Sequence, residues 1–145
     1  MVRVSPQEAA ELLKQGWKHV DVRSEPEFER GHPEGAYNIP LLNFHPIRGM
    51  VPNRDFVRVI EALFPRETKL VVGCERGNRS MRAVQLLEAA GYNDVVDQRA
   101  GFGGAADPFG RVVEAGWRDA GLPVAAGGGG ELGWEALRAR TGSGG

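Results

Sequence analysis

Along this chain, short apolar runs alternate with stretches that have helical features. Apolar runs of strand length stand at 2–4, 18–23, 36–40, 69–73 and 94–97. Four helices are predicted between them, from N-capping residues or from apolar positions at helical spacing, over 6–15, 24–30, 53–64 and 80–91. Strands that alternate with helices indicate an α/β domain with a mainly parallel sheet covered on both faces.

The rest of the chain carries weaker patterns. Residues 41–52 show neither an apolar run of strand length nor apolar positions at helical spacing, so they are expected to be irregular. A glycine-rich loop then leads to residues 112–124, which we expect to pack back as a helix and a final extended piece. We therefore predict one domain over residues 1–124, followed over residues 125–145 by a glycine-rich linker, a short helix and a frayed end.

Length and composition narrow the function only slightly. The chain has 145 residues, which suits a single core, and its 18 basic and 19 acidic residues give no support for a nucleic-acid or membrane partner. No apolar run is long enough to span a bilayer, and the first residues lack the apolar core of a signal peptide, so a cytoplasmic location is expected. The single cysteine excludes an internal disulfide and a multi-cysteine metal site, and we expect neither metal nor cofactor.

That cysteine stands where an α/β domain usually binds ligands. Cys74 follows the most apolar strand, and the predicted helix begins at Ser80. In parallel sheets, ligands bind beyond the carboxyl ends of the strands. The position favours a functional site over a structural one.

The loop after the cysteine has the composition of an anion cradle. It consists of Glu75, Arg76, Gly77, Asn78, Arg79 and Ser80. The unpaired N–H groups of a first helical turn attract anions, and Gly77 lets the backbone curl without a Cβ clash. Two arginines add positive charge, so a thiolate at Cys74 should be stabilised there and act as a nucleophile toward an anionic substrate. A lone cysteine is often only a small buried apolar group, but this combination favours catalysis or anion binding.

Two motifs and a closing segment resemble one known family. The sequence CERGNRS is similar to the active-site loop of the rhodanese family, and VDVRSEPEFERGHPEGAYNIP, residues 20–40, resembles its other signature. The later GFGG, Trp117 and AGLPV resemble its closing segment, so the resemblance covers residues 2–124. It implies a rhodanese-like three-layer domain with a five-stranded, mainly parallel sheet and helices on both faces. It also implies that Cys74 takes a sulfane sulfur from a donor such as thiosulfate, becomes a persulfide and passes the sulfur to a thiophilic acceptor.

The resemblance also suggests roles for the loop side chains. Arg76 lies where many relatives place a basic residue that meets the donor. Arg79 either binds a donor oxyanion or braces the loop through an acidic partner. Glu75 departs from relatives that carry a basic residue there, and it would repel thiosulfate. Because Cys74 has no second cysteine to form a disulfide with, the persulfide needs an external acceptor such as cyanide, a small thiol or a partner protein's cysteine.

Some residues outside the loop are expected to support it or the core. Asp21 and Arg23 stand at the carboxyl end of the second strand and could reach the loop, with buried pairing favoured for Asp21. His32 lies in a turn and is interpreted as structural, because a thiolate needs no base. Trp117 and Trp134 are interpreted as packing residues.

Two other functions remain open on the residues alone. Cysteine phosphatases and arsenate reductases share the scaffold resemblance, but they place five residues between cysteine and arginine. Here four residues separate Cys74 from Arg79, and the smaller cradle fits the outer sulfur of a persulfide better than a phosphoryl group. A non-catalytic persulfide-carrier or regulatory module is the other alternative, and an inactive regulatory or binding module is disfavoured because Cys74 is present.

Overall fold

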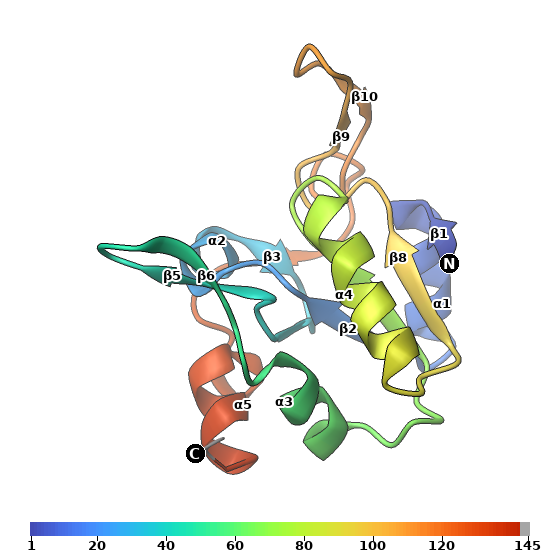
Figure 1. The fold of residues 1–145 in the computed structure, drawn as a ribbon. Coiled ribbons are helices and arrows are strands. Elements are labelled where there is room, and N and C mark those ends of the chain that lie inside the picture. Colours follow the sequence, from blue (N-terminus) through green and yellow to red (C-terminus); the bar gives the residue numbers. More distant parts are fainter. Residues whose placement is uncertain (143–145) are drawn as a thin grey trace.

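A five-stranded parallel sheet forms the centre of the molecule (Figure 1). The structure is a computed structural model that describes residues 1–142. All four strand pairs of the sheet are parallel, as the sequence predicted. The strands, in their spatial order, are β1 (Val2–Val4), β8 (Val95–Gln98), β7 (Leu70–Gly73), β2 (Lys18–Asp21) and β4 (Tyr37–Asn38).

Helices cover both faces of this sheet, which confirms the three-layer prediction. They are α1 (Pro6–Lys14), α2 (Glu25–Arg30), α3 (Phe56–Leu63), α4 (Asn78–Ala89), α5 (Trp134–Arg140) and the short 3-10 helix η1 (Gly130–Leu132). Ser5 starts α1 because its hydroxyl accepts the N–H of Glu8, whose carboxylate accepts the N–H of Ser5. Within residues 1–142, no helix is long and apolar enough to cross a membrane.

Successive side chains along the strands pack into two separate cores, one on each face of the sheet. Val72 of β7 joins a large cluster with α3, α4 and α5, whereas its neighbour Val71 joins a smaller cluster with α1 and Trp117. This is the two-residue period of a strand that is buried on both faces. Leu70, Val71 and Val72 are fully buried, so β7 is held from both sides where it delivers Cys74.

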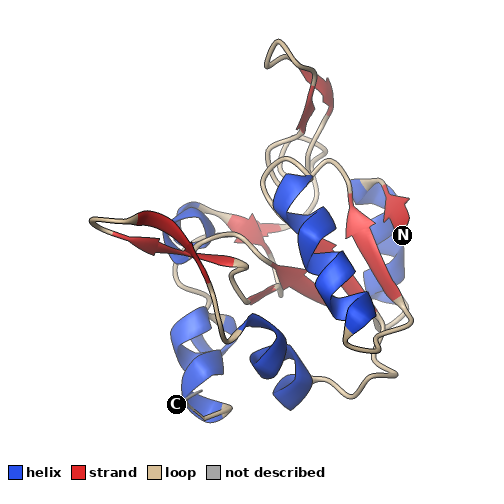
Figure 2. Ribbon diagram, in the orientation of Figure 1, coloured by secondary structure: helices blue, strands red, loops and turns tan. Residues whose placement is uncertain are grey.

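Three two-stranded ribbons lie outside the central sheet (Figure 2). They pair β5 (Leu42–His45) with β6 (Gly49–Pro52), β9 (Ala105–Ala106) with β10 (Val112–Glu114), and β3 (His32–Pro33) with β11 (Val124–Ala125).

Two expectations from the sequence are therefore wrong. Residues 41–52 form a hairpin rather than irregular chain, and residues 112–124 contain β10 and turns in place of the expected helix. The final extended piece expected there is present, as the start of β11. Local turns and cross-strand pairs hold such ribbons. Their large apolar side chains, such as Phe44 and Val113, stay exposed, so no core-facing periodicity marks them in the sequence.

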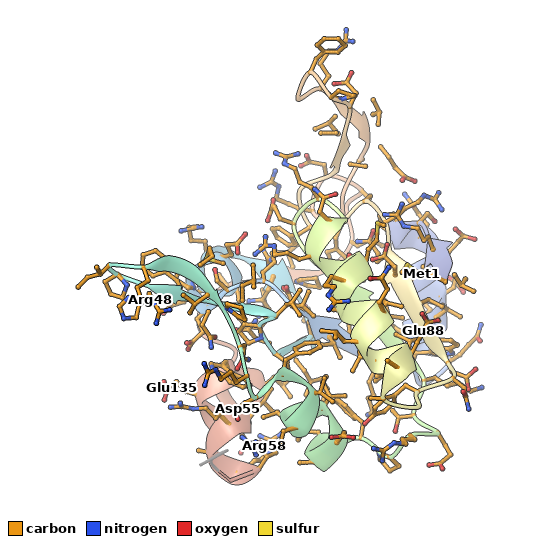
Figure 3. All side chains as sticks on the ribbon, in the orientation of Figure 1. Met1, Arg48, Asp55, Arg58, Glu88 and Glu135 are labelled. Carbon is orange, nitrogen blue, oxygen red and sulfur yellow. The ribbon has the colours of Figure 1, made fainter. Side chains whose placement is uncertain are left out.

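The C-terminal segment packs onto the domain. Gly127 N–H donates a hydrogen bond to Glu29 O at 2.9 Å, and a methyl group at Gly129 would lie 2.7 Å from the Phe28 ring, so the expected linker lies against α2. Trp134 and Leu137 of α5 belong to the larger core, as expected for Trp134. Arg58 of α3, labelled in Figure 3, donates a hydrogen bond to the carbonyl oxygen of Thr141. Most of the tail predicted to fray, residues 143–145, lies outside the described residues.

A substitution in α5 tests whether this segment shares the stability of the domain. Leu137 is fully buried, so Leu137→Ala should lower the free energy of unfolding by about 2–5 kcal/mol. The exposed control Arg138→Ala should change it by less than about 0.5 kcal/mol. The measurement is urea denaturation followed by fluorescence and by circular dichroism. An unchanged midpoint in Leu137→Ala would show that residues 125–145 do not contribute to the cooperative core.

The smaller core contains a buried histidine. His19 of β2 is 4% exposed, its ring centroid lies 5.0 Å from that of Trp117, and its Nδ1 has no hydrogen-bond partner within residues 1–142. Burial lowers the pKa of His19 to about 4; attraction to Asp21 opposes the shift and repulsion from Arg23 adds to it. The folded protein therefore holds His19 neutral over a range in which the unfolded chain would protonate it.

This difference predicts a loss of stability in mild acid. Below the ordinary pKa of 6.5 the unfolded chain binds the proton first, so stability should fall from there down to about pH 4. At about pH 4.5 the loss should be roughly 2–3 kcal/mol relative to neutral pH. Urea denaturation across this range should show the slope in the native sequence and a much weaker slope in His19→Leu. An equal slope in both proteins would contradict the assignment.

Candidate active site

Cys74 sits at the junction of β7 and α4 with its sulfur held by the loop. The side chain is 2% exposed. Gly77 N–H donates a hydrogen bond to Sγ at 3.1 Å, and the thiol donates one to Ser80 Oγ at 3.3 Å. Helix α4 begins at Asn78, two residues before the predicted start, so Asn78, Arg79 and Ser80 form its first turn. The sequence placed the sulfur beside a helix N-terminus, and the structure does so as well.

The loop is fixed in shape by the segment after β8. Phe102 N–H donates to Cys74 O at 2.8 Å, and Gly103 N–H donates to Glu75 O at 2.9 Å. Gly77 has a left-handed φ of 92°, and a methyl group there would lie 2.2 Å from the carbonyl oxygen of Arg99. Only glycine can meet both conditions. The curl that points an N–H at the sulfur is thus set by backbone packing.

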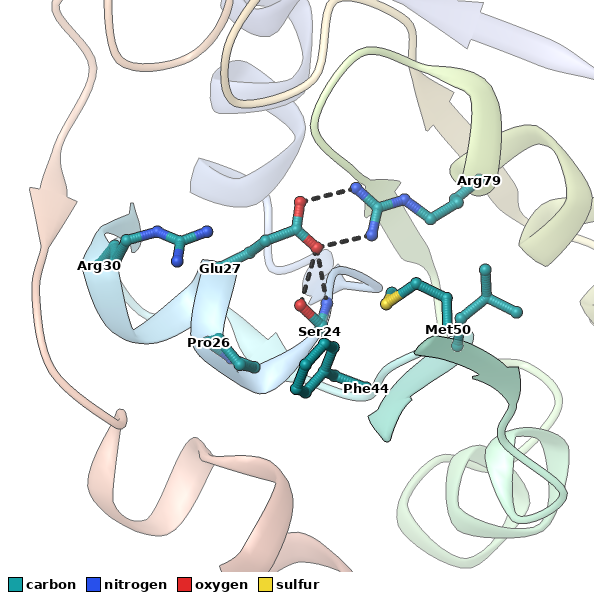
Figure 4. Close-up of a pocket in the computed structure, with 8 residues that line it drawn as sticks. Ser24, Pro26, Glu27, Arg30, Phe44, Met50 and Arg79 are labelled. Atoms are coloured by element: carbon teal, nitrogen blue, oxygen red, sulfur yellow. Dashed lines mark hydrogen bonds and ion pairs between the residues drawn. The ribbon is translucent and has the colours of Figure 1, made fainter. Parts of the chain in front are cut away.

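Arg79 braces the loop through an acidic partner. Its two terminal nitrogens donate to the two carboxylate oxygens of Glu27 at 2.7 and 2.8 Å (Figure 4). Burial alone would raise the pKa of Glu27, but hydrogen bonds from Arg79 and Ser24 lower it to about 2. Hydrogen bonding to Glu27 raises the pKa of Arg79 against the effect of burial, and attraction to Cys74 adds to the rise. Of the two roles considered for Arg79, this geometry is that of a brace.

A buried ion pair lies beneath the loop. Arg23 is almost fully buried; it donates to Asp21 Oδ2 at 2.8 Å, to Gly31 O at 2.7 Å and to Glu75 Oε1 at 3.1 Å. Burial would lower the pKa of Arg23, but Asp21 and Glu75 raise it. Asp21 therefore has the pairing role expected of it, and the charge of Glu75 is balanced by Arg23. The repulsion of thiosulfate expected from Glu75 is weakened by this contact.

The remaining predicted residues lie at the rim or away from the sulfur. Arg76 and Asn78 are exposed, and Arg76 donates a hydrogen bond to Gly104 O at 3.2 Å. His32 lies under α2, with Nδ1 2.8 Å from Phe28 O and its ring stacked on Phe28 at 3.6 Å, which suits the structural role expected of it.

Two residues that organise the site were missed from the sequence. Glu27 belongs to the capping sequence SEPE at 24–27, and its carboxylate accepts the N–H and hydroxyl of Ser24, so this local role hid its second partner. Asn38 holds the end of β2 by donating to the carbonyl oxygens of Asp21 and Arg23. Its place in the second rhodanese signature was the only signal that could have identified it.

Two pockets flank the Glu27–Arg79 pair. The larger, of about 570 Å³, lies between α2 and the β5–β6 hairpin and is lined by Ser24, Pro26, Glu27, Arg30, Leu42, Phe44, Met50 and Arg79. The smaller, of about 450 Å³, is lined by Arg23, Glu27, Arg30, Gly31, Glu75, Phe102 and Arg118. The part of the chain that the structure describes contains no group of three or more metal-ligating side chains. The chemistry available here is that of a thiol among paired charges and backbone amides.

Comparisons with known proteins agree on one family. The Rhodanese-like domain family matches residues 5–105. The senescence-associated protein DIN1 of Raphanus sativus is 39% identical over 94 residues, 65% of this chain and 51% of that protein. Thiosulfate sulfurtransferase 16, chloroplastic, of Arabidopsis thaliana is 37% identical over 99 residues, 68% of this chain and 82% of that protein. The chain thus spans about half the length of the first relative and most of the second.

A solved structure shows the same fold. The crystal structure of Rv0390 from M. tuberculosis superimposes with a TM-score of 0.72 at 28% identity. The alignment covers 88% of this chain and 98% of that one, so it extends beyond the region that the family matches.

Gly77 provides a test of how the loop is fixed. Gly77→Ala combines a left-handed backbone with a clash against Arg99 O, whereas Gly35→Ala combines a similar φ of 82° with open space. The Gly35 variant should lose about 1–2 kcal/mol of stability. The Gly77 variant should lose more and should also react faster with thiol reagents, because its loop no longer encloses Cys74. Equal stability losses and equal Cys74 alkylation rates in the two variants would contradict this account of the loop.

Proposed function

Because the chain belongs to the Rhodanese-like domain family, we propose that it is a sulfurtransferase that carries a sulfane sulfur on Cys74. The observation that carries the proposal is the position of the sulfur, which receives an N–H hydrogen bond at 3.1 Å inside a loop shaped by backbone packing. A relative named thiosulfate sulfurtransferase, at 37% identity, supports the reaction class.

In the first half-reaction the thiolate of Cys74 attacks the sulfane sulfur of thiosulfate. The sulfur–sulfur bond of the donor breaks, sulfite leaves with the bonding electrons, and a persulfide remains on Cys74. The N–H of Gly77 and the first amides of α4 stabilise the negative sulfur. When the thiol is deprotonated, the Ser80 hydroxyl donates to Sγ instead of accepting from it.

In the second half-reaction an external nucleophile attacks the outer sulfur. The bond between the two sulfurs breaks, and the Cys74 thiolate leaves. The chain has only this cysteine, so no internal disulfide can release the sulfur. The persulfide therefore waits for its acceptor, and the kinetics are ping-pong.

The pairing of Arg79 argues against the phosphatase alternative. A phosphoryl group needs several free donors around its oxygens, and both terminal nitrogens of Arg79 are already bound to Glu27. The loop also has four residues between Cys74 and Arg79, which leaves a smaller cradle. A persulfide needs only the backbone amides near Sγ.

Intact-mass measurements test the proposal. The protein is treated with thiosulfate, freed of donor by gel filtration and weighed. We expect one added sulfur on the native sequence and none on Cys74→Ser, since the thiol is the only carrier. Adding cyanide should then remove that sulfur and release about one thiocyanate per chain.

Three outcomes separate the alternatives. A native protein that retains no sulfur and transfers it only when donor and acceptor are both present would rule out the covalent carrier. Turnover of an aryl phosphate that depends on Cys74 would favour the phosphatase. If the persulfide forms but loses its sulfur no faster than a free alkyl persulfide does, the protein is a non-catalytic persulfide carrier.

A further inference from the structure

The larger pocket beside the loop has an apolar wall that the proposed donor does not explain. Phe44 and Met50 are cross-strand neighbours on the β5–β6 hairpin, and both line the pocket (Figure 4). Phe44 is 57% exposed and Met50 is 43% exposed. Exposed apolar side chains gathered in a concave site usually meet a ligand. Thiosulfate has no apolar part that could bind this wall.

The charge that this pocket leaves free is positive. Arg79 and Glu27 neutralise each other at its base. Arg30, at the end of α2, lines the same pocket and forms no ion pair or side-chain hydrogen bond with any residue from 1 to 142. An apolar wall beside one uncommitted guanidinium complements a ligand with an apolar body and a negative group.

The pocket also borders the helical turn that contacts the reacting sulfur. Arg79 lines the pocket from the first turn of α4, and the next residue, Ser80, is hydrogen-bonded to Cys74 Sγ at 3.3 Å. A ligand that enters between the hairpin and α2 thus reaches the loop at Arg79. The persulfide, in turn, needs an acceptor from outside the chain.

We propose that this pocket binds the acceptor, and that the acceptor is a low-molecular-weight thiol with an apolar body and a carboxylate. The body lies on Phe44 and Met50, and the carboxylate pairs with Arg30. This inference rests on the proposed function, because it assigns the second half-reaction of the same site. The acceptor thiolate attacks the outer sulfur of the Cys74 persulfide, the sulfur–sulfur bond breaks, and the Cys74 thiolate leaves. The acceptor becomes a persulfide, and no oxidant or reductant is needed.

Four matched thiols separate the two parts of the proposal. Mercaptopropanol, mercaptopropionate, mercaptohexanol and mercaptohexanoate vary chain length and charge independently. The Cys74 persulfide is formed with thiosulfate, freed of donor and mixed with each thiol, and the loss of sulfur is followed by intact mass. Each rate is divided by the rate of the same thiol with a free alkyl persulfide, which removes intrinsic reactivity.

Mercaptohexanoate should give the highest normalised rate. Burial of one methylene is worth roughly fourfold in binding, so the longer chain should gain on the order of tenfold when partly buried. The carboxylate should add about two- to fivefold, because Arg30 is exposed and screened by solvent. High salt should reduce the second effect and leave the first.

Two variants and two controls assign these gains to side chains. Phe44→Ser should remove most of the length effect, and Arg30→Gln should remove the charge effect while keeping the length effect. Phe109→Ser changes an exposed aromatic residue on the β9–β10 hairpin, away from the pocket, and Arg48→Gln changes a charge at the tip of the β5–β6 hairpin (Figure 3). Both controls should behave like the native sequence.

The outcomes distinguish this inference from the proposed function. If Cys74 gains no sulfur from thiosulfate, the proposed function itself fails. If Cys74 is loaded but the four thiols discharge it at equal normalised rates, the acceptor pocket is wrong. A length effect that survives Phe44→Ser, or a charge effect that survives Arg30→Gln, would likewise overturn the assignment.

Discussion

The buried guanidinium of Arg23 holds together the parts that make up the site. It is hydrogen-bonded to Asp21 at the end of β2, to Gly31 after α2 and to Glu75 in the loop, and its Cζ lies 4.4 Å from the centroid of the Phe102 ring. A buried charge is tolerated only when its donors are matched, and removing one partner leaves an uncompensated ion. These four segments therefore have to keep their mutual positions for Arg23 to remain buried. The same constraint fixes the position of the loop that follows Cys74.

Charge pairing also determines which forces act on the sulfur. Glu75 is balanced by Arg23, and Arg79 is balanced by Glu27. The nearest side-chain charges thus largely cancel around the loop. What remains close to Sγ is the N–H of Gly77 and the hydroxyl of Ser80. Fixed dipoles of this kind need no reorganisation when negative charge moves between two sulfurs.

The local parts of this design could be predicted from the sequence. The apolar run before Cys74, the glycine in the loop and the helical spacing after Ser80 predicted a strand, a turn and a helix, and the structure confirms all three. The start of α4 was placed two residues late, because the left-handed Gly77 lets the helix begin at once. The alternation of strands and helices likewise predicted the parallel sheet.

The long-range pairs could not be predicted. Glu27 reaches Arg79, and Arg23 reaches Glu75, each across 52 residues, and no local pattern marks either contact. Glu27 satisfied its cap motif and so gave no reason to seek a second partner. The β5–β6 hairpin was missed because its apolar residues face water, whereas periodicity detects only residues that face a core.

The strand order has a consequence for how the molecule behaves in concentrated solution. The two outer strands, β1 and β4, are its shortest, with three and two residues. An outer strand exposes unpaired backbone groups that can recruit another chain, and a short one gives such a chain little length to pair with. Pro40 follows β4 closely and lacks the N–H that an added strand would need. The wholly apolar β7, the strand most prone to pair with another chain, therefore lies in the middle of the sheet. This strand order disfavours edge-to-edge aggregation.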